Sequence, residues 1–151
     1  MDIIQGRLLS VLEEHDFRGC GRSFNRTTLD GLIHVITFQV GTRWSSDQFT
    51  VNLGIHIPEL CETEQLPVVR EVDCAIRARL GELDDEPDDI WWLLEDHPDL
   101  TQELRQRFSD HAMPLFEKFR NRPACLRHIT ALAEAGIVDA DLDDIHTALK
   151  R

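Results

Sequence analysis

Amide and guanidinium side chains recur on one side of a predicted β-sheet, where they could bind an anion. The predicted strands alternate polar with apolar residues, and successive side chains of a strand point to opposite faces. Amide and guanidinium N–H groups donate hydrogen bonds to carboxylates and phosphates. The candidate ligand-binding residues are Gln39, Asn52, Arg77, Arg79 and His56, with Arg26 beside them. The alternative is that C-terminal helices cover this face and pair their carboxylates with the arginines.

An acidic run is the second candidate site. Six carboxylates lie within eight positions, and we take them as candidate partner-binding residues: Glu82, Asp84, Asp85, Glu86, Asp88 and Asp89. Like charges this close repel one another until a cation or a basic partner neutralises them. The net charge of −12 at pH 7 opposes binding to nucleic acid and suits a basic protein partner. The alternative is a solvated loop on a protein whose charge serves solubility.

Motifs for cofactors, metals and covalent catalysis do not occur. The sequence has no phosphate-cradling or dinucleotide-binding glycine motif, and Asn25 stands where a hydrolase elbow after Ser23 needs glycine. A separate group of carboxylates around Asp141 and Asp144 departs from the calcium-loop pattern and predicts helix capping. We therefore expect no cofactor, no metal site and no catalytic residues, which favours a protein that is not an enzyme.

Cysteine spacing and hydropathy indicate the compartment. The four cysteines form no Cys-x-x-Cys pair, which favours reduced thiols. No apolar run approaches the ~18 residues that span a bilayer. The N-terminus lacks the basic region and apolar core of a signal peptide. We expect a cytoplasmic protein that binds no membrane.

Two alternating runs joined by a polar connector at 41–48 position the candidate anion site. Folded about this connector, they form an antiparallel hairpin over 32–57. Its register matches like with like: Val40 with Phe49, Phe38 with Val51, Ile36 with Leu53, Gln39 with Thr50 and Thr37 with Asn52. A one-residue slip would turn every side chain to the wrong face, so the pattern predicts this register.

The remaining elements lie around this hairpin. Helical periodicity predicts a helix over 1–15, and Asp30-Gly31 predicts a two-residue turn between a strand from Arg22 and the hairpin. A fourth strand is predicted over 74–80, and 90–94 is open between strand, helical turn and plug. Helices are predicted from Pro98, with Asp96 as cap and a break at Pro114, then from 123 and over 141–150. We predict one α+β domain over 1–151: an N-terminal helix, an antiparallel sheet of about four strands, and a C-terminal helical half packing on the sheet.

Several segments together resemble a known family. They are 21–26 (Gly-Arg-Ser-Phe-Asn-Arg), 35–39 (Val-Ile-Thr-Phe-Gln), 49–55 (Phe-Thr-Val-Asn-Leu-Gly-Ile), 77–83 (Arg-Ala-Arg-Leu-Gly-Glu-Leu) and the Trp91-Trp92 pair. They resemble the bacterial proteins grouped as domain of unknown function 4304, over roughly 5–120. The resemblance implies an α+β domain and supplies no activity, cofactor or catalytic residue. It places Gln39, Asn52, Arg77, Arg79 and Trp92 in one shared pattern, so Trp92 joins the candidate ligand-binding residues.

Two functional hypotheses follow. The first is a non-enzymatic protein-interaction module, such as an inhibitor or immunity-type protein, that binds a basic partner through the acidic run. The second is a small anionic-ligand-binding or hydrolase-like protein that uses the polar sheet face. The sequence leaves the oligomeric state open.

Overall fold

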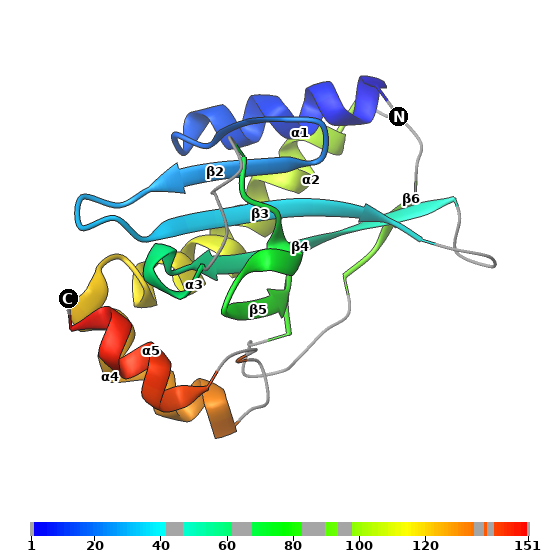
Figure 1. Ribbon diagram of the computed structural model, residues 1–151. Coiled ribbons are helices and arrows are strands. Elements are labelled where there is room, and N and C mark those ends of the chain that lie inside the picture. The colour runs from blue at the N-terminus through cyan, green and yellow to red at the C-terminus, as the bar shows by residue number, and fades with distance from the viewer. Residues whose placement is uncertain are drawn as a thin grey trace.

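The computed structural model describes residues 2–41, 47–61, 68–82, 90–93, 98–134, 138 and 141–150. Its antiparallel sheet has the order β1-β2-β3-β4-β5, and the short β6 pairs with the start of β4 (Figure 1). The strands are β1 (Arg18–Cys20), β2 (Ser23–Thr27), β3 (Ile33–Val40), β4 (Gln48–His56), β5 (Ile76–Arg79) and β6 (Trp92–Leu93). The sequence predicted about four strands and missed β1. It left 90–94 undecided, and Trp92–Leu93 of this segment form β6.

Among the described residues, five α-helices accompany the sheet: α1 (Asp2–Glu14), α2 (Leu100–Arg107), α3 (Met113–Lys118), α4 (Arg122–Glu134) and α5 (Leu142–Leu149). The sheet lies in front of α2 and α3 in Figure 1, and α4 and α5 lie beyond its lower end. Two short 3-10 turns, η2 (Pro58–Leu60) and η3 (Glu71–Asp73), follow β4. The predicted α+β architecture, with an N-terminal helix and C-terminal helices on the sheet, is confirmed.

The predicted β3–β4 register is confirmed at every pair, including Phe38 with Val51 and Thr37 with Asn52. The turn between β2 and β3 differs from the prediction. The Thr28 amide donates to the Leu32 carbonyl, so the loop holds three residues and ends on Gly31 at φ 92°. The extra residue moves Phe24 opposite Ile36, onto the apolar face.

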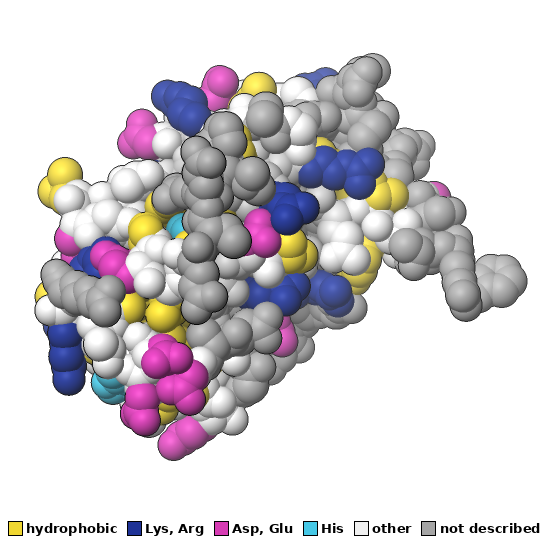
Figure 2. Space-filling model, viewed as in Figure 1, with side chains coloured by type: hydrophobic (Ala, Val, Ile, Leu, Met, Phe, Trp, Pro, Cys, Tyr) yellow, Lys and Arg dark blue, Asp and Glu magenta, His cyan; other side chains and the backbone are white. Residues whose placement is uncertain are grey.

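A segment outside the sheet crosses the face opposite the helices. Residues 68–74, called the strap below, include η3 and pack Val69 and Cys74 against Ile33 and Val35 of β3. Figure 2 looks onto this face: Lys and Arg side chains gather over the β3–β5 part of the sheet, and Asp and Glu side chains gather over α5. The described helices α1–α3 therefore pack on the face opposite to the polar one.

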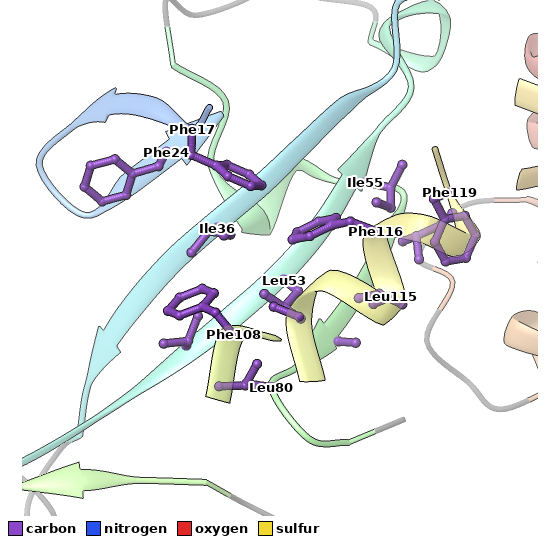
Figure 3. Close-up of a cluster of buried hydrophobic side chains, with 14 of the residues drawn as sticks. Phe17, Phe24, Ile36, Leu53, Ile55, Leu80, Phe108, Leu115, Phe116 and Phe119 are labelled. Carbon is purple, nitrogen blue, oxygen red and sulfur yellow. The ribbon is translucent and has the colours of Figure 1, made fainter. Parts of the chain in front are cut away.

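The helix-side face of the sheet carries the main hydrophobic core (Figure 3). Phe108 and Phe116, from the helical segment that follows α2, point toward Ile36 and Leu53 of the sheet, and all four are at most 2% exposed. Fully burying side chains of this size contributes roughly 1.5–3 kcal/mol each. This face therefore fixes which way the hairpin side chains point.

Proline and capping residues set the helix boundaries. Pro114 lies in the first turn of α3, and a π-helical turn, Phe108–Ala112, precedes it, as expected for a residue that lacks an N–H. The α2 helix begins at Leu100, later than the prediction from Pro98, and Asp96 lies outside the described residues. Asp141 caps α5 by accepting from the amides of Asp143 and Asp144, which confirms the capping prediction.

Two polar side chains lie among the apolar residues of the helix-side core. His34 is 2% exposed and accepts at Nδ1 from the Arg26 guanidinium (3.0 Å). Since arginine can only donate, the proton of the neutral ring lies on Nε2, which donates to the Phe119 carbonyl at 2.8 Å. The Arg26 guanidinium also lies over the rings of Phe17 and Phe116. Arg26 is therefore on the helix side, contrary to the prediction that groups it with the polar face.

Burial of His34 predicts acid sensitivity. Burial, helped by the charge of Arg26, lowers the pKa of His34 from 6.5 to about 4. The unfolded chain therefore binds this proton more readily between these two values, and stability is lost as the pH falls from 6.5 toward 4. We expect wild type to lose about 2 kcal/mol more unfolding free energy than His34→Gln between pH 7.5 and 5 in urea titrations. Parallel profiles of the two proteins would contradict this assignment.

Candidate functional site

A polar row crosses the face opposite the helices. Ser23 of β2 lies opposite Thr37 of β3, Thr37 opposite Asn52 of β4, and Asn52 opposite Arg79 of β5. Facing residues of neighbouring strands lie about 4.5–5.5 Å apart, so the four side chains form a continuous line. The pairing of β4 with β5 therefore brings together two of the predicted ligand-binding residues, Asn52 and Arg79.

The strap covers one end of this row through hydrogen bonds from the sheet. Asn25 binds the strap backbone twice: its Nδ2 donates to the Val69 carbonyl at 2.8 Å, and its Oδ1 accepts from the Val69 amide at 2.7 Å. Thr37 Oγ1 accepts from the Glu71 amide at 3.1 Å and shares a 2.9 Å hydrogen bond with Ser23. These contacts replace the regular ladder bonds that an irregular segment lacks.

Arg77 forms an ion pair with the strap. Its Nε donates to Glu71 Oε1 at 2.8 Å and its Nη2 donates to Glu71 Oε2 at 3.3 Å. Glu71 is 5% exposed, and a buried carboxylate is costly unless it is paired in this way. The alternative considered from the sequence was that carboxylates of the C-terminal helices cover this face and pair with its arginines. Here the carboxylate comes from the strap.

The other end of the polar row extends beyond the strap contacts. Asn52 Nδ2 donates to Gln39 Oε1 at 2.8 Å, and Gln39 is exposed. The guanidinium carbon of Arg79 lies 5.4 Å from the centroid of the Trp91 ring, and the Arg79 amide donates to Glu82 Oε2 at 2.8 Å. Gln39, Asn52 and Arg79, called the amide corner below, are the predicted site residues that the fold brings together.

Two predicted site residues lie elsewhere. Trp92 is 9% exposed and stacks on Phe49 at 5.4 Å between ring centroids, within the helix-side core. His56 shares the face of the polar row but lies opposite Ile33, at the far end of β4 from Gln48. It is 4% exposed, burial lowers its pKa, and its Nε2 has no hydrogen-bond partner among the described residues. Trp91, the neighbour of Trp92, is the indole that meets the amide corner.

The acidic run is described only at its first residue. Glu82 is exposed, while Asp84, Asp85, Glu86, Asp88 and Asp89 lie outside the described residues. The chain on either side is attached to two consecutive residues of β4. The Leu80 amide donates to the Val51 carbonyl at 2.9 Å, and Thr50 Oγ1 donates to the Ile90 carbonyl at 2.5 Å. Leu80 and Ile90, on either side of the run, are thus held at neighbouring positions of β4.

Sequence reasoning missed the strap and its carboxylate. A signal was present in Gly54, since a glycine inside a strand often marks a close approach of another segment. A Cβ at Gly54 would lie 2.7 Å from Cys74 Sγ and 3.0 Å from Cys74 Cβ. The strap is that approaching segment.

The amide corner is rich in hydrogen-bond donors. Gln39, Asn52 and Arg79 carry amide and guanidinium N–H groups, which donate hydrogen bonds. The nearby Glu71 accepts from Arg77, and Glu82 accepts from the backbone amide of Arg79. Within the described ranges, no group of three His, Cys, Asp or Glu side chains could hold a metal ion. No described helix is long and apolar enough to cross a membrane.

Comparison with known proteins identifies the family. The family model described as a domain of unknown function (DUF4304) matches residues 8–118, so the chain belongs to this family. This range includes β1–β6, the strap and α3, whereas α4 and α5 lie beyond it. No curated protein and no solved structure matches the chain.

The close approach at Gly54 gives a prediction with a matched control. Gly54→Ala places a methyl group against Cys74, so we expect it to lower the unfolding free energy by about 2 kcal/mol. Gly6→Ala makes the same chemical change in α1, where nothing lies within 4 Å of the added carbon. We expect it to raise stability by about 0.5–1 kcal/mol, because alanine favours a helix. Urea titrations measure both, and a neutral Gly54→Ala would mean that the strap does not pack there.

Proposed function

We propose that this protein is a non-enzymatic interaction module that binds a basic protein partner, in the manner of an inhibitor or immunity protein. The main support for the proposal is that the chain on both sides of the acidic run is attached to the sheet. Six carboxylates follow β5 and precede β6, and the chain on either side is attached to Val51 and Thr50 of the same strand. A charged segment with both ends fixed to a sheet loses less freedom on binding than a free tail.

Long-range electrostatics support the same partner class. The net charge of −12 attracts a basic protein and accelerates their encounter. Exposed carboxylates at the start of α5, from Asp141, Asp143 and Asp144, add to the negative surface of the described residues. The amide corner lies next to the acidic run in sequence at Arg79 and Trp91, so one partner could contact both.

We place the protein in the cytoplasm. Burial raises the pKa of the Cys125 thiol to about 12 and raises that of Cys74 as well, which keeps both thiols protonated and unreactive. Cys74 and Cys125 are free thiols in the structure. Free thiols are usual in a reducing compartment.

Co-purification from the cells that naturally contain this protein tests the proposal. We expect a basic protein to be recovered in stoichiometric amount at about 0.15 M salt and to be released at about 1 M salt, where charge interactions are screened. The variant Asp84→Asn/Asp85→Asn/Glu86→Gln removes three charges from the acidic run and is expected to lose the partner.

A control variant removes three carboxylates elsewhere. Glu13→Gln/Asp110→Asn/Glu134→Gln changes the same net charge at exposed helix positions and is expected to retain the partner. Equal loss in both variants would attribute binding to net charge alone and reject the acidic run as the site. Recovery of the protein without a partner at every salt concentration would reject the interaction module itself.

A further inference from the structure

His56 is a buried histidine with one ring nitrogen that lacks a partner. It lies opposite Ile33 at the end of β4 and is 4% exposed. Its Nε2 atom is buried and has no hydrogen-bond partner among the described residues. The ring also bonds to the backbone of Asp73, in η3, in a way that favours the charged ring. The backbone group is therefore the carbonyl, and the neutral ring carries its proton on Nδ1.

The hydrogen bond from His56 attaches the end of the strap to the sheet. The other polar attachments of the strap are the bonds of Asn25 to Val69 and of Thr37 to the Glu71 amide. Each of these bonds comes from a single side chain and not from a strand ladder. Segments held in this way can open while the rest of a domain stays folded.

A positive charge on His56 is costly while the strap is closed. The second N–H, on Nε2, has no acceptor among the described residues. Burial is the largest influence and lowers the pKa of His56, although the carboxylates of Asp73 in η3 and Glu59 in η2 act in the opposite direction. Both carboxylates already form ion pairs, with Arg70 and Arg122 respectively. The closed strap therefore favours the neutral ring.

We propose that His56 makes the strap a pH-sensitive cover: protonation of its ring in mild acid detaches the strap from the sheet, while the helix-side core stays folded. Opening returns the ring to water, where its pKa is near the ordinary value of 6.5, so the open form binds the proton more readily. The closed form is thus favoured above pH 6.5 and is lost as the pH falls below it.

Opening changes which groups the sheet presents. It removes the cover from Val35, which is fully buried in the closed form, and releases Asn25 and Thr37 from the strap backbone. This inference goes beyond the proposed function, because it concerns the strap and the sheet face beneath it rather than the acidic run.

Hydrogen exchange of the ¹⁵N-labelled full chain, followed by NMR between pH 7.5 and 5, tests the proposal. Each rate is converted to a protection factor against an unstructured peptide at the same pH. We expect the amides of Val69 and Glu71 to lose at least about threefold more protection than the amide of Leu53, in the centre of the sheet. Equal losses at all three amides would mean that only the whole domain responds to acid, which would overturn the proposal.

Variants separate the two buried histidines. His56→Asn keeps an N–H donor for the Asp73 carbonyl and cannot be charged, so the extra loss at the strap is expected to disappear. His34→Gln removes the histidine of the helix-side core and is expected to leave the extra loss unchanged. Persistence of the loss in His56→Asn rejects the role of His56. If this variant does not fold, the ring ¹⁵N shifts of His56 in wild type decide: strap protection must fall in step with protonation of this ring, and a fall at any other pH rejects the proposal.

Discussion

The pairing of Arg77 with the buried carboxylate of Glu71 is the interaction on which the second face of the sheet depends. A charged group that is 5% exposed is tolerated only with a close partner, and Arg77 provides two hydrogen bonds from β5. The pair anchors the strap, which in turn buries Val69 and Cys74 against Ile33 and Val35. An irregular segment thereby becomes a second layer on the sheet, and the polar residues left beyond it form the amide corner.

The two faces of the sheet are thus held by different physics. On the helix side, aromatic residues such as Phe116 exclude water from the hairpin, and hydrophobic burial dominates. On the strap side, single polar side chains such as Asn25 and Thr37 satisfy the backbone of a segment without regular structure. Polar networks of this kind stabilise strongly only when every member is satisfied. The same residues that hold the strap therefore limit which polar groups remain for a ligand.

Sequence reasoning was most accurate where a period of two governs the structure. The alternation through Phe38 and Val51 fixed the hairpin register, since any slip would expose the apolar face. The sequence predicted less of the candidate site. Glu71 reaches Arg77 through the packing of an irregular segment, and no periodicity in the sequence describes such a segment. Trp92 and Arg26 were misplaced for a related reason. β6 turns Trp92 toward Phe49. The three-residue turn sets the β2 register, which places Arg26 on the same face as Phe24, beside His34 and two aromatic rings.

Amide hydrogen exchange of the native protein tests most directly whether the strap is bound to the sheet. Val69 and Glu71 lie outside every strand, and yet their amides donate to Asn25 Oδ1 and Thr37 Oγ1. If the strap is bound, both amides exchange orders of magnitude more slowly than in an unstructured chain, at rates close to those of neighbouring strand residues. Exchange of both amides at the rate of an unstructured peptide would contradict it, and with it the origin of the amide corner.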